Sequence, residues 1–156
     1  MQSTSELRLS PKIVSTPSRT LHMMGEEIHI ALRGEDTGGA FSIIEDLTPP
    51  AGGPPPHVHS LEDELFYVLE GQYELKVGED LHRAGPGTCV FAPRGIPHAF
   101  RNVSDKPSRM MILFSPPGFE RFFEDVDAAA AAGPPPFETI VALAASYGNH
   151  LVPAQA

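Results

Sequence analysis

Proline and glycine recur throughout this chain and divide it into short apolar segments. The sequence contains 17 prolines and 14 glycines, which fall between these segments and form no single low-complexity tract. Runs such as Gly85-Pro86-Gly87 and Pro93-Arg94-Gly95 favour tight turns. Because many short strands separated by turns are typical of a sandwich or barrel, the sequence predicts an all-β domain.

Ten segments have the length and composition of strands. No helical crossover of ten or more residues lies between them before Pro116, which argues against a parallel sheet. The predicted strands are Leu7–Ser15, Thr20–Met24, Glu27–Leu32, Ala40–Asp46, Glu64–Leu69, Tyr73–Val77, Leu81–Arg83, Thr88–Ala92, Ala99–Val103 and Ser108–Phe114.

Two of these strands are apolar on both faces. The alternate residues of Leu65–Leu69 are apolar on either face, and Met110–Phe114 is apolar throughout. A small barrel buries only one face of a strand, so the other face needs a cover. We expect the N-terminal strands, the C-terminal helices or a second subunit to supply it, and we therefore expect a homodimer.

After Pro117 the apolar pattern changes from the period of a strand to that of a helix. The first predicted helix carries Phe119, Phe122, Phe123 and Val126 on one face. The second follows Pro136, ends at Gly148 and carries Phe137, Ile140, Val141, Ala144 and Tyr147. Both are expected to pack on the outside of the barrel, and a lid over its mouth is the alternative. The chain is thus divided into N-terminal strands (1–35) suited to pairing with a second subunit, a barrel core (36–115) and a helical extension (116–156).

The charge of the chain limits the classes of partner that it can bind. The formal net charge is −9, and the sequence contains no run of lysine or arginine. Both features argue against binding to nucleic acid or to an anionic membrane. No apolar run approaches the roughly 18 residues that a membrane helix needs. The N-terminal residues lack the pattern of a signal peptide, and one cysteine allows no internal disulfide. We expect a cytoplasmic protein whose ligand is a small molecule.

Two histidines and a glutamate form the first candidate cluster. His57 and His59 are two residues apart, so their imidazoles share one face of a strand. Glu64 follows five residues after His59, which puts it on the opposite face unless Ser60–Asp63 turns or bulges. Glu62 competes for the carboxylate role. We prefer Glu64 because it opens an apolar strand, which would fix its carboxylate at the wall of a cavity.

The second cluster lies about forty residues further on. Pro93-Arg94-Gly95 is a tight turn, and His98 begins the strand that leaves it. His98 shares a strand face with Phe100 and Asn102, so its imidazole is expected to point inward. Taken alone, this segment is a structural turn followed by a histidine.

Together the two clusters resemble the two motifs of the cupin superfamily. The first motif is approximated by G-x4-H-x-H-x4-E-x6-G from Gly52 to Gly71, and the second by G-x5-P-x-G-x2-H-x3-N from Gly87 to Asn102. The first glycine stands one residue closer to His57 than is usual. The resemblance implies a cupin jelly-roll β-barrel, with the C-terminal helices packed on it. It also implies one divalent transition metal (Fe, Mn, Ni, Co, Cu or Zn), a choice that imidazole-rich sites favour. The implied ligands are His57, His59, Glu64 and His98.

A closer and less specific resemblance is to single-domain, quercetin 2,3-dioxygenase-like proteins of the cupin_2 type. It implies an oxidoreductase, a metal-dependent dioxygenase that acts on a small aromatic, enol or phenol substrate. Glu64 would then ligate the metal and also accept the hydroxyl proton as the catalytic residue. Two alternatives stay open: non-redox isomerase, decarboxylase or lyase chemistry, and a non-catalytic cupin that binds a small molecule.

Several other side chains receive secondary interpretations. Five apolar residues suit the wall of an aromatic-binding cavity, although core packing explains each equally well: Phe66, Phe91, Phe100, Met111 and Phe114. Surface or core packing is expected for the remaining histidines, His22, His29, His82 and His150. Cys89 is expected to be a buried, inert thiol in a strand.

Overall fold

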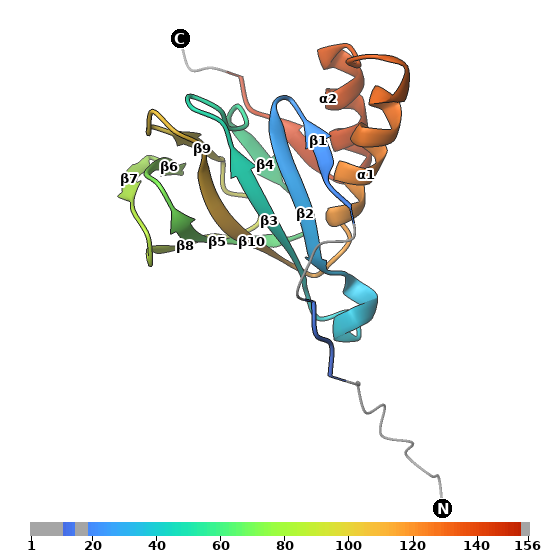
Figure 1. Ribbon diagram of the computed structural model, residues 1–156, viewed down its shortest axis with the longest axis horizontal. Coiled ribbons are helices and arrows are strands. Elements are labelled where there is room, and N and C mark those ends of the chain that lie inside the picture. Colours follow the sequence, from blue (N-terminus) through green and yellow to red (C-terminus); the bar gives the residue numbers. More distant parts are fainter. Residues whose placement is uncertain (1–10, 15–18, 154–156) are drawn as a thin grey trace, which may run out of the picture.

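The computed structural model describes residues 11–14 and 19–153, and eleven short strands form two antiparallel sheets there (Figure 1). The first sheet contains β1 (Leu21–Met23), β2 (Glu26–Leu32), β3 (Ser42–Thr48), β5 (Asp63–Glu70), β8 (Cys89–Ala92) and β10 (Ser108–Ser115). The second contains β4 (His57–His59), β6 (Tyr73–Val77), β7 (Asp80–Ala84), β9 (His98–Asn102) and β11 (Asn149–Leu151). Their orders are β1-β2-β3-β10-β5-β8 and β11-β4-β9-β6-β7. This arrangement confirms the all-β, jelly-roll prediction.

Strand β10 lies near the centre of the six-stranded sheet and shows why period-two sequences fold this way. Its residues alternate strictly between buried and half-buried. Ile112 pairs with Ile44 of β3 on one side and with Phe66 of β5 on the other, and all three side chains are buried. Because alternate side chains point to one face, these strands together build the apolar core between the sheets.

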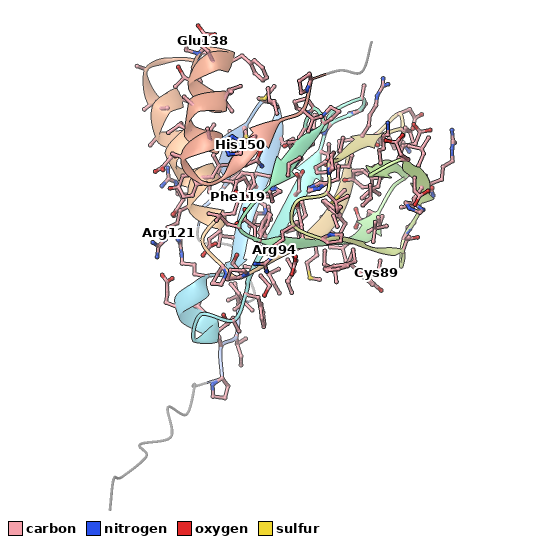
Figure 2. The ribbon with its side chains drawn as sticks, turned by 180° about the vertical axis from the view of Figure 1, so that it is seen from behind. Cys89, Arg94, Phe119, Arg121, Glu138 and His150 are labelled. Carbon is pink, nitrogen blue, oxygen red and sulfur yellow. The ribbon has the colours of Figure 1, made fainter. Side chains whose placement is uncertain are left out.

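Among the described residues of the single chain, neither the N-terminal strands nor the C-terminal helices cover the outer face of β5, so of the predicted covers only a second subunit stays a prediction. Phe66 and Val68 face the core, whereas Tyr67 and Leu69 are 38% and 36% exposed. The two C-terminal helices lie against β1 and β11 and leave this face open. The partner strand β8 follows the same alternation. Its Cys89 pairs with Tyr67 and is exposed, so it is not the buried thiol expected (Figure 2).

The C-terminal helices confirm the predicted change of period. Helix α1 (Glu120–Ala129) buries Phe122, Phe123 and Val126, and Phe119 immediately before it is also buried. The short 3₁₀ segment η2 (Ala130–Ala132) leads towards α2 (Phe137–Ser146). Figure 1 shows both helices on one side of the barrel. No helix in the described part of the chain has the length and apolarity needed to cross a membrane.

Three segments differ from the predicted elements. Residues 11–14 form no strand, and the rest of the predicted strand Leu7–Ser15 lies outside the described residues. A short 3₁₀ segment, η1 (Gly34–Thr37), links β2 to the following strand. At the other end, β11 follows α2 and was not predicted. It pairs with β4, placing Asn149 opposite His59 and Leu151 opposite His57.

Candidate metal centre

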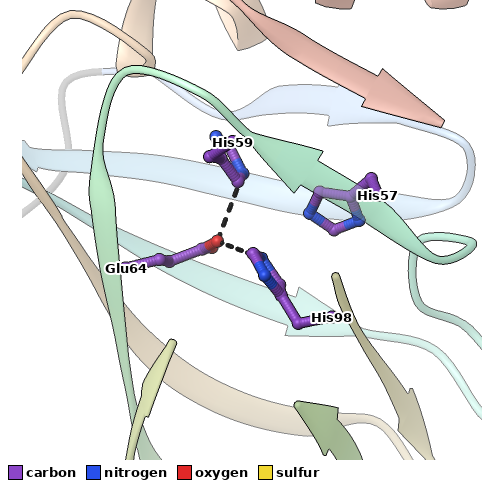
Figure 3. A group of neighbouring side chains, drawn as sticks. All are labelled: His57, His59, Glu64 and His98. Atoms are coloured by element: carbon purple, nitrogen blue, oxygen red, sulfur yellow. Dashed lines mark hydrogen bonds and ion pairs between the residues drawn. The ribbon is translucent and has the colours of Figure 1, made fainter. Parts of the chain in front are cut away.

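Three strands bring the four predicted ligands together. His57 and His59 project from one face of β4, Glu64 projects from β5, and His98 begins β9 directly opposite His57. All four side chains are buried, and one donor atom of each lies within 4.8 Å of the others. Figure 3 shows the side chains converging on one point. The structure therefore unites residues that are up to 41 positions apart in the sequence.

A glycine allows the loop before β4 to approach β9. Gly53 has φ +135°, and a Cβ atom there would lie 2.0 Å from the carbonyl oxygen of Phe100. The backbone N–H of Asn102 donates to the carbonyl of Gly52 in the same contact. Since only glycine fits this close approach, the residue helps place His57 beside His98.

The break between β4 and β5 decides which glutamate joins the histidines. The chain turns over Ser60–Glu62, and the Ser60 backbone N–H donates to the carbonyl of Gly148. Glu64 thereby comes back to the inner face, as the sequence required. Glu62 instead lies behind His59, with its Oε1 atom 2.5 Å from Nδ1 of that imidazole. Glu62 is thus a support for His59 and not a member of the cluster.

Hydrogen bonds orient all three imidazoles in the same way. Nδ1 of His57 lies 2.8 Å from the carbonyl oxygen of Pro55, and Nδ1 of His98 lies 3.0 Å from that of Ile96. A carbonyl oxygen only accepts, so each Nδ1 carries a hydrogen and donates it. The Nδ1 of His59 donates likewise to Glu62. The Nε2 atoms are therefore the ones available to a shared ligand, an arrangement typical of metal-binding histidines.

Glu64 is the negative centre of the cluster. Its Oε2 atom lies 2.7 Å from Nε2 of His98 and 3.2 Å from Nε2 of His59. Burial alone would raise the pKa of Glu64, but the charge of His59 and hydrogen bonds from His59 and His98 hold it well below its usual range. The carboxylate is therefore ionised, as a ligand to a cation must be.

The two histidines of β4 have opposite electrostatic surroundings. Burial lowers the pKa of His57 to about 4, and the neighbouring His98 adds to this effect. Burial would also lower the pKa of His59, but Glu64 and Glu62 outweigh it and raise the pKa to about 9. A cation that binds His59 therefore has to displace a proton from it.

The donor set fits a divalent transition metal. Three imidazole nitrogens and one carboxylate oxygen suit Fe, Mn, Ni, Co, Cu or Zn better than Mg or Ca, which prefer oxygen ligands. The donors are close enough to share one ion, and hydrogen bonds hold the imidazoles in the required orientation. The four residues therefore form a possible metal site.

An apolar cavity of about 150 Å³ adjoins the cluster. His57, His59 and Glu64 form one part of its wall, and side chains from both C-terminal helices close another. The apolar residues of the barrel and α1 region that line it include Phe100, Ile112, Phe114, Phe119, Phe122 and Phe123. Those of α2 are Phe137, Ile140, Val141 and Ala144. The helices therefore pack on the barrel and also contribute to the cavity.

Only part of the predicted aromatic wall lines this cavity. Phe100 and Phe114 do so, whereas Phe66 packs in the core behind His98, at 5.8 Å between ring centroids. Phe91 is exposed on the outer face of β8, and Met111 is half-buried on the outer side of β10. Strand alternation explains this division, because neighbouring residues point to opposite faces.

Sequence reasoning missed two neighbours of His59. The Phe119 ring packs edge-on against the imidazole at 4.5 Å between centroids, and Nδ2 of Asn149 lies 3.1 Å from its Nε2. Figure 2 shows Phe119 between the helices and the barrel. Phe119 had the signal of a buried helix face, but nothing local marks Asn149, which lies 90 residues from His59.

The remaining histidines stay outside the site. His22, His82 and His150 are exposed. His29 is half-buried, and its Nε2 lies 3.0 Å from the hydroxyl of Thr20. These positions agree with packing or surface roles.

Comparisons with known proteins agree with the fold. The Cupin domain family model, Cupin_2, matches residues 44–114. Uncharacterized protein SCO3923 of Streptomyces coelicolor is 32% identical over 56 residues, 36% of this chain and 52% of its own length. Dimethylsulfoniopropionate lyase DddQ of Ruegeria pomeroyi is 41% identical over 61 residues, 38% of this chain and 29% of its own length. The chain spans about half the length of the curated relatives that it matches first.

A solved structure shows the same architecture over a longer stretch. KdgF from Halomonas sp. superposes with a TM-score of 0.57 and 21% identity, covering 64% of this chain and 86% of its own. At this identity the likeness concerns the fold alone. The Cupin domain model matches residues 44–114, and both motifs that resemble the cupin superfamily lie within that stretch.

Proposed function

We propose that this chain is a metal-dependent cupin enzyme, a dioxygenase acting on a small, largely apolar molecule that carries an enol or phenol hydroxyl. The cavity carries the proposal, because it places three imidazoles and a carboxylate beside an aromatic wall. Its volume of about 150 Å³ suits a single ring, since apolar cavities of roughly this size bind benzene.

The charges around the cavity favour such a substrate over an anionic one. Glu26, Asp46 and Glu64 line it, and no lysine or arginine does so among the described residues. Away from the metal cluster, a carboxylate or phosphate group would lie beside Glu26 and Asp46 and find no lysine or arginine of the described lining to pair with. That part of the lining favours an uncharged or cationic group over an anionic one.

Each group of residues has a distinct part in this proposal. A divalent transition metal bound to the cluster supplies a Lewis acid and, when redox-active, the chemistry of dioxygen. Glu64 is the carboxylate of the cluster and accepts the proton of the substrate hydroxyl. Phe114 and Phe119 exclude water and hold the ring against the imidazoles. Glu62 keeps His59 in position.

Oxygen uptake tests the proposal. Iron, manganese and nickel forms of the protein are supplied with catechols and flavonols, and oxygen consumption is followed with an electrode. We expect saturable uptake with at least one metal and substrate, lost in the double variant H57A/H59A. The matched control is His150→Ala, an exposed histidine of β11. Absence of uptake in every combination would refute dioxygenase activity.

A second candidate function is non-redox lyase or isomerase chemistry at the same site. The observation in its favour is the 41% identity to dimethylsulfoniopropionate lyase DddQ over 61 residues. Here the metal acts only as a Lewis acid, so activity survives strict exclusion of oxygen and persists with zinc. Tight ligand binding without turnover in either assay would instead favour a non-catalytic cupin.

A further inference from the structure

A second pair of acidic side chains lines the cavity, apart from the metal cluster. Glu26 begins β2, and Asp46 lies on the neighbouring strand β3. Asp46 pairs in register with Ile28, two residues after Glu26, so both carboxyls project from the inner face of the sheet. They are 3% and 2% exposed. The chemistry proposed above uses neither of them.

The hydrogen bonds around Asp46 leave the pair open to a ligand. The Thr48 hydroxyl donates to Oδ1 of Asp46 at 2.8 Å, and the Tyr73 hydroxyl donates to Thr48 at 3.0 Å. These two hydrogen bonds make Asp46 an acceptor. Within the described residues, no side chain forms a hydrogen bond or an ion pair with the carboxyl of Glu26, although it is almost completely buried.

The pair also lacks a compensating charge. Burial and the nearby Asp46 raise the pKa of Glu26 well above its usual range. Burial raises the pKa of Asp46 to about 7, the Thr48 hydrogen bond opposes this, and Glu64 adds to it. The raised pKa values mean that burial without a cation favours the protonated carboxyls, and an ammonium group can replace such a proton and pair with the carboxylates. The aromatic side chains that share the cavity also attract cations through their ring faces.

We propose that Glu26 and Asp46 form a subsite for the ammonium group of an amine ligand. The ligand's ring then occupies the apolar part of the cavity, and its hydroxyl faces the imidazoles of β4. The hydroxyl end of this description rests on the proposed function, whereas the ammonium end rests only on the acidic pair. A protonated amine offers hydrogen-bond donors to both carboxyls, and charge-assisted bonds of this kind are the stronger ones.

Three matched probes test the subsite: benzylamine, benzyl alcohol and benzoate, which share a ring and differ in charge. Each is titrated into the metal-loaded protein at neutral pH by calorimetry. We expect benzylamine to bind at least about tenfold more tightly than benzyl alcohol, as one added charge-assisted hydrogen bond implies. Benzoate should bind more weakly than benzylamine, and any binding through the metal should be lost in H57A/H59A.

Variants locate the preference. Glu26→Gln and Asp46→Asn should each remove the advantage of benzylamine and leave the affinity for benzyl alcohol unchanged. Glu27→Gln is the matched control, since it makes the same change at the next residue of β2, which is half-buried on the other face. Circular dichroism and metal content establish that each variant is folded and loaded. The two variants are independent, so failure of one to fold leaves the other as the test.

One competing explanation needs its own control, because a neutral amine can also ligate a metal. The titrations are therefore repeated on H57A/H59A, where the preference for benzylamine should persist. Its loss there, equal affinities for the three probes, or an undiminished preference in both Glu26→Gln and Asp46→Asn would overturn the proposal. Binding requires no turnover, so a negative oxygen-uptake result refutes the dioxygenase proposal and leaves this one standing.

Discussion

Glu62 offers the sharpest test of how the site is organised. The residue is 4% exposed, and its carboxylate accepts the Nδ1 hydrogen of His59 at 2.5 Å. Glu62→Gln keeps an acceptor but removes its charge, which changes a charge-assisted bond into a neutral one. The difference is about 1.4 kcal/mol, equal to a roughly tenfold weaker metal affinity. Glu62→Ala removes the acceptor altogether, and the expected loss approaches about 100-fold.

Metal affinity is measured by competition with a chelating dye, using cobalt or zinc, for the wild type and both variants. The control is Asp63→Asn, which removes a charge from the adjacent residue, whose carboxylate binds Arg94 and not a histidine. It should retain the wild-type affinity. Wild-type affinity in both Glu62 variants would refute an orienting role. An equal loss in Asp63→Asn would show that general charge, and not the bond to His59, is responsible.

Four further predictions concern the site, the core and the surface. The double variant H57A/H59A should retain no stoichiometric metal in elemental analysis. Phe119→Ala removes a ring that is 5% exposed and packs on His59. The substitution should lower the free energy of unfolding, measured by urea titration, by about 3–5 kcal/mol. A loss below about 1 kcal/mol would contradict this packing. Burial raises the pKa of Asp46 in the folded protein to about 7, so the folded state favours the protonated carboxyl. The stability that protonated Asp46 contributes is complete below its pKa in the unfolded chain and is lost as the pH rises through about 7. Between about pH 4 and 8 the metal-free wild type should therefore lose stability relative to Asp46→Asn. Parallel pH profiles would refute this. We also propose that the exposed outer face of β5 is where two copies pair; light scattering should then show a dimer for the wild type and a monomer for Tyr67→Lys.

Much of the architecture follows from local patterns in the sequence. Strict alternation in β10 and glycine- or proline-rich turns predict antiparallel strands, because side chains two residues apart share a face. The spacing of Phe119, Phe122 and Phe123 predicts a helix with one buried face for the same kind of reason. The four candidate ligands are also recognisable from local sequence motifs. His57 and His59, for example, need only a strand between them for their imidazoles to point the same way.

Tertiary structure alone decided the relations between distant residues. It placed Glu62 behind His59 and Glu64 beside His98, because the course of the turn at Ser60–Glu62 sets which carboxylate faces inward. Asn149 reaches the site only because β11 pairs with β4 in a particular register. Periodicity reports which residues share a face, whereas register and packing determine what that face meets. The four candidate metal ligands and the wall residues Phe100 and Phe114 were therefore predictable from sequence, whereas the positions of Glu62 and Asn149 beside His59 were not.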